Sequence, residues 1–117
     1  MKRDLGDKSR IRHILEAISN IESFVENVSL EEFLKNKEKI AAVERMIEII
    51  GEATNHISDE IIYNSNSSTP WRKIIANRNV LAHEYFRIDY KIIYQIATKE
   101  IIPLKKEIEK ILQDLEK

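Results

Sequence analysis

The sequence predicts an all-α fold, an up-and-down bundle of four main helices with additional short helices. The chain has 117 residues, of which 43% are hydrophobic, and this suffices for one core in a single domain spanning residues 1–117. It contains only two glycines and two prolines, too few for the many turns of an all-β protein. Apolar residues also recur at intervals of three and four, the period of an amphipathic helix.

The first long helix is predicted from Arg10 to Glu26. Six apolar residues in this range would form one stripe along a helix: Ile11, Ile14, Leu15, Ile18, Ile21 and Val25. The letters SLEE follow, in which Ser29 is expected to cap the next helix. Glu32 would reach back to Ser29 and complete a capping box.

The second long helix is predicted from about Asn36 to His56. Its apolar set is wide, which indicates burial on more than one side: Ile40, Val43, Met46, Ile47, Ile49, Ile50 and Ala53. Gly51 costs about 1 kcal/mol relative to alanine inside a helix and suggests a close helix contact. Residues 58–60 (Ser-Asp-Glu) are interpreted as the cap and acidic first turn of a short helix.

Two further signals organise the rest of the chain. Thr69 is predicted to be the N-cap of another helix, with Pro70 at its first position. The final segment is expected to run from Asp89 to the C-terminus, and Pro103 is expected to kink it or divide it in two. Five apolar residues in this segment keep a heptad-like spacing: Ile101, Leu104, Ile108, Ile111 and Leu115.

Composition excludes several classes of function. The chain has no cysteine, so disulfides, thiolate metal sites and cysteine catalysis are excluded. The charged first residues lead into no apolar stretch, and no apolar run approaches the roughly 20 residues that span a bilayer, so we expect a cytoplasmic protein. His13 and His56 lack metal-ligand spacing and are interpreted as surface or helix-end histidines. We expect neither a metal nor another cofactor.

The letters NRNVLAHEYF, residues 77–86, place an arginine, an asparagine, a histidine and a tyrosine within one short segment. The net charge of the chain is −1, but residues 71–91 hold five basic residues against two acidic ones. This patch suits a small anionic target. Projected on a helix, Arg78 falls within an apolar stripe of Trp71, Ile74, Ile75, Leu81 and Ala82. A guanidinium there is costly unless it is paired or another surface closes over it.

Two arrangements could bring Arg78 and His83 together. On a straight helix the two side chains would point roughly 140° apart. Either the helix breaks near Ala82, or a second subunit completes the site. A two-fold interface brings two copies of one patch together, so we expect a homodimer with the Trp71–Ile75 stripe at or next to its interface.

The residue types in this segment suit cleavage of the RNA backbone. A histidine such as His83 can move a proton from the attacking 2′-hydroxyl or onto the leaving oxygen. Arg78 offers planar, permanently charged donors to the phosphate, and Asn79 can orient either group. This chemistry requires no metal. The alternative is that His83 ends a helix beside a structural arginine.

Other residues leave further alternatives open. Trp71 could stack on a base or pack in the core or dimer, and Glu52 could approach the basic site or be a surface glutamate. The protein as a whole could be a ribonuclease, a non-catalytic helical dimer that binds a nucleotide or a partner protein through the same patch, or a structural helical subunit.

The pattern R-x-x-x-x-H-x-Y, here Arg78, His83 and Tyr85, resembles the signature of the HEPN superfamily in its HepT-like branch. The segments ERMIEIIGEA at 44–53 and PWRKIIANRNVLAHEYFRID at 70–89 are also similar to that branch. The resemblance covers most of the chain, from the first helix to the last.

The resemblance implies a four- to five-helix fold, a homodimer with the motif at its interface, and metal-independent ribonuclease activity. Members typically act as toxins of toxin–antitoxin pairs, here of a type II- or type VII-like system. The partner is an MNT-type nucleotidyltransferase antitoxin, which blocks the toxin and in some systems attaches AMP to the motif tyrosine. Carried over, Arg78 and His83 are catalytic, Asn79 supports them, and Tyr85 is the position open to AMPylation.

Overall fold

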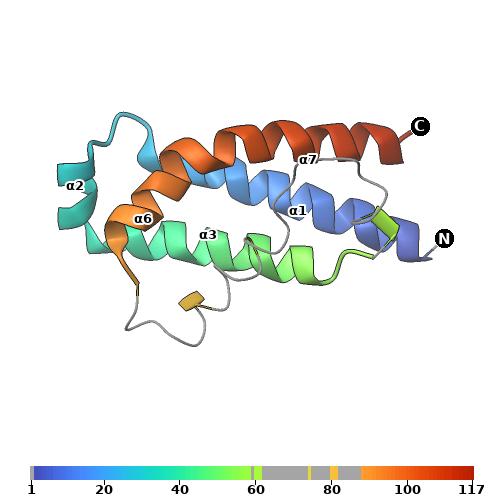
Figure 1. The fold of residues 1–117 in the computed structure, drawn as a ribbon, viewed down its shortest axis with the longest axis horizontal. Helices are drawn as coiled ribbons and strands as arrows, with labels where there is room; N and C mark the ends of the chain where they lie inside the picture. The colour runs from blue at the N-terminus through green and yellow to red at the C-terminus, as the bar shows by residue number, and fades with distance from the viewer. Residues whose placement is uncertain (1, 59, 62–73, 75–79, 82–87) are drawn as a thin grey trace.

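The computed structural model describes residues 2–58, 60–61, 74, 80–81 and 88–117, and these residues form helices without any strand. Three long helical segments lie side by side, and both chain ends lie at the same end of the molecule (Figure 1). They are α1 (Lys2–Val25), α3 (Lys37–Asn55) and α7 (Ile101–Leu115). The helix α1 packs against both of the others. The all-α prediction is confirmed for this part of the chain.

The helix α1 begins earlier than the predicted start at Arg10 and ends one residue before the predicted end at Glu26. Its predicted stripe is the buried one, except that Leu15 is only partly buried. Four isoleucines of this stripe have no exposed surface: Ile11, Ile14, Ile18 and Ile21. Asn27, which follows the helix, adopts a left-handed backbone conformation with φ of 58°. An asparagine tolerates this conformation better than most residues, so it suits the end of a helix.

The predicted capping box opens α2 (Leu30–Lys35). The Ser29 hydroxyl accepts a hydrogen bond from the Glu32 backbone N–H at 3.1 Å, and the Ser29 backbone N–H donates to the Glu32 carboxylate at 3.1 Å. The hydrogen bonds from the backbone and then the side chain of Ser29 lower the pKa of Glu32. Phe33 on this helix is fully buried, and its ring lies 5.3 Å from that of Tyr94. Tyr94 donates its hydroxyl to the Val28 carbonyl at 2.6 Å, which fixes α2 to the C-terminal segment.

The bounds of α3 agree with the predicted range. Asn36 is its N-cap and accepts a hydrogen bond from the Lys39 backbone N–H, and His56 is its C-cap. The buried residues are Ile40, Val43, Ile47, Ile50, Gly51, Ala53 and Thr54. Thr54 donates its hydroxyl to the Ile50 carbonyl at 2.7 Å, so this buried polar group is satisfied.

The C-terminal segment is divided, as the position of Pro103 predicted. Asp89 caps α6 (Tyr90–Gln95), a five-residue π-helix η2 (Ile96–Glu100) follows, and α7 begins at Ile101. Pro103 is therefore in the first turn of α7, where a missing backbone N–H does least harm. The π-helix was not predicted.

The fourth main helix predicted after Thr69 lies outside the described residues, apart from positions 74, 80 and 81. Ile74 is 9% exposed and belongs to the core of the single chain. Leu81 is partly buried against the same core. One residue of the Trp71–Ile75 stripe assigned to a dimer interface, Ile74, is thus packed within its own chain.

The core lies between α1, α3 and α7, and α2 and α6 cover one end of it (Figure 1). Aliphatic side chains dominate it, and burying each contributes about 1.5–3 kcal/mol. No described helix is both long and apolar enough to cross a membrane.

Candidate functional site

The four motif residues, Arg78, Asn79, His83 and Tyr85, lie outside the described residues. The structure does describe the residues on either side of the stretch 82–87, which contains the histidine and the tyrosine. Val80 and Leu81 precede this stretch, and Ile88 and Asp89 follow it. All four line one hollow, so both ends of the stretch are placed at the same location.

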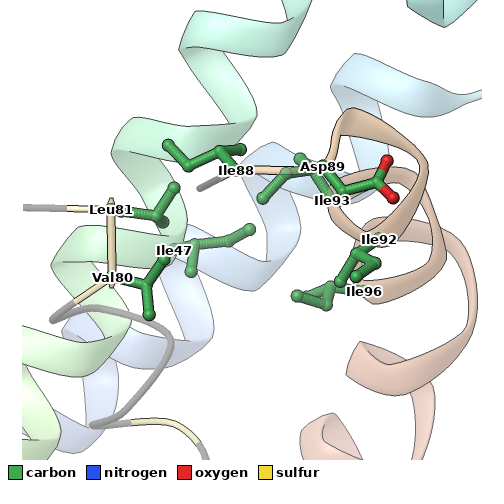
Figure 2. Close-up of a pocket in the computed structure, with 8 residues that line it drawn as sticks. All are labelled: Ile47, Val80, Leu81, Ile88, Asp89, Ile92, Ile93 and Ile96. Carbon is green, nitrogen blue, oxygen red and sulfur yellow. The ribbon is translucent and has the colours of Figure 1, made fainter. Parts of the chain in front are cut away.

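This hollow, called the α3/α6 hollow below, has a volume of about 210 Å³. Figure 2 shows Ile47 of α3 with Val80 and Leu81 on one side and the side chains of α6 on the other. It is lined by Ile47, Val80, Leu81, Ile88, Asp89, Ile92, Ile93 and Ile96. Seven of the eight side chains are aliphatic, so the hollow suits packing better than binding of a charged ligand.

Among the described lining residues of the α3/α6 hollow, Asp89 is the polar one, and its carboxylate caps the helix α6. It accepts a hydrogen bond from the Lys91 backbone N–H at 2.9 Å, and its carbonyl accepts from the N–H groups of Ile92 and Ile93. Capping of this kind typically contributes about 1 kcal/mol. Asp89 therefore fixes the point at which the chain leaves the motif segment and enters α6.

A second hollow lies between α1 and α3 and is mostly charged. This α1/α3 groove has a volume of about 500 Å³ and is lined by Arg10, His13, Arg45, Glu48, Ile49, Glu52, Ala53 and His56. Both histidines are exposed, as the sequence predicted, but the fold brings them to one groove. The described residues contain no group of three or more His, Cys, Asp or Glu side chains that could hold a metal ion.

Each carboxylate of the α1/α3 groove lies near a nitrogen-bearing side chain from α3 or from its C-cap. Glu48 lies 3.8 Å from Arg45, and Glu52 lies 3.6 Å from the Nε2 atom of His56. Glu52 is a half-exposed surface residue, and the motif that it could approach lies outside the described residues. Beside the groove, burial and then the charge of Glu48 raise the pKa of Glu44.

The buried carboxylate of Asp7 and its partner Ser58 are close in sequence to residues that line the α1/α3 groove. Asp7 is 2% exposed and accepts two hydrogen bonds from Ser58, from the backbone N–H at 3.0 Å and from the hydroxyl at 2.8 Å. Asp7 stands one turn before Arg10, and Ser58 stands two residues after His56. This contact ties the start of α1 to the end of α3.

Sequence reasoning missed the α1/α3 groove and the Asp7–Ser58 contact. The signal for the groove was a polar stripe on the second predicted helix, in which Arg45, Glu48, Glu52 and His56 follow one another at intervals of three and four. Nothing local marked Asp7 as buried.

Relatives of this chain are named as ribonucleases, so the chain falls in the ribonuclease class. More narrowly, the chain belongs to the family described as Ribonuclease HepT-like, whose profile matches residues 14–111. The expectations of a HepT-like protein and of a ribonuclease are confirmed at this level.

Three relatives illustrate the similarity. A Methanocaldococcus jannaschii protein named "Putative RNase MJ1216" is 38% identical over 98% of this chain and 93% of its own. "Putative RNase TTE0752" of Caldanaerobacter subterraneus subsp. tengcongensis is 37% identical over 88% and 91%. "Probable ribonuclease HepT" of Thermococcus cleftensis is 35% identical over 95% and 98%. No solved structure gives a significant match.

Proposed function

We propose that this protein is a metal-independent endoribonuclease toxin that acts in the cytoplasm and is neutralised by a cognate nucleotidyltransferase antitoxin. The observation that carries the proposal is the complete motif of Arg78, His83 and Tyr85, which falls inside the range matched by the ribonuclease family. The described residues that flank the stretch 82–87 line one hollow at the core.

The proposed reaction uses the 2′-hydroxyl of the substrate as nucleophile. A bond forms between O2′ and phosphorus, and the bond between phosphorus and O5′ breaks, which yields a 2′,3′-cyclic phosphate and a 5′-hydroxyl. His83 removes the proton from O2′ or donates one to O5′. Arg78 stabilises the negative charge that grows on the phosphate, and Asn79 orients one of these groups. Charge stabilisation and proton transfer then both come from side chains.

We further propose that the catalytic site is completed by a second copy of the chain. Two large apolar side chains follow the motif directly and are exposed in the single chain, Tyr90 at 46% and Ile92 at 51%. A dimer that covers them would bring its two motif segments near the two-fold axis. Ile74 of the Trp71–Ile75 stripe is packed in the core of its own chain. Tyr90 and Ile92 are therefore better candidates for the interface than Ile74.

Light scattering at tens of micromolar (about the range for a modest interface) tests the dimer. The wild type is expected to be dimeric, and Ile92→Ser is expected to shift it towards monomer. Ile102→Ser is the matched control, because Ile102 on α7 is 52% exposed. A monomeric wild type would contradict the shared site.

Tyr85 is the proposed point of control by the antitoxin. AMP attached there would add negative charge and bulk where the RNA phosphate has to bind. Co-expression with the neighbouring nucleotidyltransferase should give intact-mass increments of AMP that vanish in Tyr85→Phe. Inhibition without a change of mass would instead assign neutralisation to complex formation.

The main experiment measures cleavage of RNA by the wild type, His83→Ala and Arg78→Ala in the presence of a chelator. We expect each variant to lose about 10²–10³-fold in rate, the usual contribution of a proton-transfer or charge-stabilising group. Arg12→Ala is the matched arginine control, because Arg12 is exposed and paired with Glu116 at 2.9 Å. Circular dichroism would verify that each variant is folded.

The outcomes separate the candidate functions. Either alanine variant cleaving at the wild-type rate would contradict the catalytic assignment. If the wild type bound RNA without cleaving it, the protein would be the non-catalytic binding module.

A further inference from the structure

The α1/α3 groove differs from a protein-docking surface in its composition. Its two apolar side chains are small or aliphatic, Ile49 and Ala53, and it contains no aromatic residue among its described lining. Protein interfaces instead depend on buried aromatic and apolar anchors. The remaining six lining residues carry or can carry a charge, so the groove suits a charged and hydrated ligand.

The described lining of the groove holds two arginines and two glutamates, and these charges are unevenly placed between the two walls. The two carboxylates, Glu48 and Glu52, both belong to α3 and lie near Arg45 of the same helix and His56, its C-cap. Among the described lining residues, those of α1 are Arg10 and His13, which are three residues apart and therefore share one face. This wall carries the charge of Arg10 and no carboxylate among the described lining residues, so it suits an anion.

Arg10 is placed against the groove wall by a local feature of α1. A Cβ atom at Gly6 would lie 3.1 Å from the Nη1 atom of Arg10, so the absence of a side chain at Gly6 leaves room for the guanidinium. Arg10 is accordingly only partly exposed, whereas Arg45 on the facing wall is 67% exposed. Planar guanidinium groups on two facing walls match the phosphates and bases of a single RNA strand, by hydrogen bonding and by stacking.

We propose that the α1/α3 groove binds the RNA strand through a backbone phosphate other than the one that is cleaved, with Arg10 and Arg45 as the main groups that bind it. The proposal rests on the proposed function for its substrate class, but it concerns binding and not the chemical step. A groove of about 500 Å³ is large enough for a nucleotide unit. It would extend the substrate-binding surface beyond the motif and would favour longer RNA over the shortest substrates.

The test measures binding of a fluorescently labelled single-stranded RNA of about ten nucleotides (a length that covers one typical binding site) by anisotropy. His83→Ala serves as the background, so that cleavage does not interfere. Adding Arg10→Gln and Arg45→Gln should raise the Kd about tenfold or more, because each substitution removes charge-assisted hydrogen bonds to phosphate. The slope of log K against log salt should become shallower by about 0.7 for each phosphate that is no longer neutralised.

A matched control removes the same number of positive charges outside the groove. Arg12→Gln with Lys105→Gln breaks two exposed ion pairs, to Glu116 at 2.9 Å and to Glu22 at 3.1 Å. This control should leave the Kd and the salt slope close to those of the background. If both pairs of substitutions weakened RNA binding equally, the effect would come from net charge alone. The groove would then not be a binding site.

Cleavage assays separate this proposal from the proposed function. In the chain that retains His83, Arg10→Gln with Arg45→Gln should raise the KM for a long RNA and leave cleavage of a dinucleotide unchanged. A wild type that cleaves no RNA would contradict the catalytic function and leave the binding result standing. Unchanged RNA binding together with abolished binding of the antitoxin would overturn the proposal in favour of protein docking.

Discussion

The two hollows of this protein share the helix α3 but differ in almost every physical property. The α3/α6 hollow is aliphatic, and Ile47, which lines it, is 4% exposed. The next residue, Glu48, lines the larger α1/α3 groove and is one-third exposed. Neighbouring residues of a helix point about 100° apart, so one helix serves two environments. The apolar hollow sits where the motif segment joins the core, and the charged groove sits where solvent and ligands have access.

This difference predicts that substitutions in the two hollows will affect different measurements. Lining residues of the α3/α6 hollow should influence mainly stability, because they are part of the core. Lining residues of the α1/α3 groove should influence mainly binding, because exposed charges contribute little to folding. Three experiments on stability follow, the first on the α3/α6 hollow and the other two on residues near the α1/α3 groove.

The largest effect is expected for Ile47→Ala. Removing a buried isoleucine side chain typically lowers the free energy of unfolding by about 2–5 kcal/mol. The matched control is Ile102→Ala, because Ile102 on α7 is 52% exposed, and its change should stay within about 0.5 kcal/mol. Urea unfolding followed by circular dichroism measures both. Equal losses of stability would contradict the assignment of Ile47 to the core.

An intermediate effect is expected for Asp7→Ala. The substitution removes both acceptors of the Ser58 backbone N–H and hydroxyl, and a buried donor without a partner costs about 1–3 kcal/mol. Asp114→Ala is the control, because Asp114 is 64% exposed and should change the free energy of unfolding by less than about 0.5 kcal/mol.

A double-mutant cycle then identifies the contact itself. Ser58→Ala combined with Asp7→Ala should reduce stability by less than the sum of the two single effects, because both remove the same hydrogen bond. Strict additivity would mean that Asp7 acts through something other than Ser58.

The smallest effect concerns Glu44, beside the α1/α3 groove. Burial and the charge of Glu48 raise its pKa above the ordinary value of 4.5, so the folded state holds this proton more tightly than the unfolded state. Its contribution to stability is therefore full below the ordinary value and is lost as the pH rises through the raised pKa. Glu44→Gln should flatten this decline above about pH 4.5, the ordinary value. Glu109→Gln, at an exposed position, should leave it as in the wild type.

Features determined by neighbouring residues could be predicted from the sequence. The capping box of Ser29 and Glu32, the approximate range of α3 and the start of the last segment at Asp89 each depend on nearby residues. The missing N–H of Pro103 predicted a kink or division of the C-terminal segment, but not the π-helix that precedes α7. The motif was recognised from its letters, but its geometry lies outside the described residues.

Features determined by the pairing of distant segments could not be predicted in this way. Asp7 and Ser58 are 51 residues apart, and a charged residue near the start of a helix gives no local sign of burial. The α1/α3 groove depends on which faces of two helices meet, so that Arg10 and His13 come to lie opposite Arg45 and His56. Periodicity identifies the face of a helix but does not identify its neighbour.

The packing of α1 against α7 has a consequence for synthesis of the protein on the ribosome. The isoleucine stripe of α1 is made first, and one of the helices that cover it is made last. Two ion pairs of α1 also need the C-terminal segment. Arg12 pairs with Glu116, and Glu22 pairs with Lys105. A nascent chain therefore has no complete core until translation is nearly finished. A chain that stops before α7 is therefore expected to remain unfolded, because part of the α1 stripe would stay uncovered.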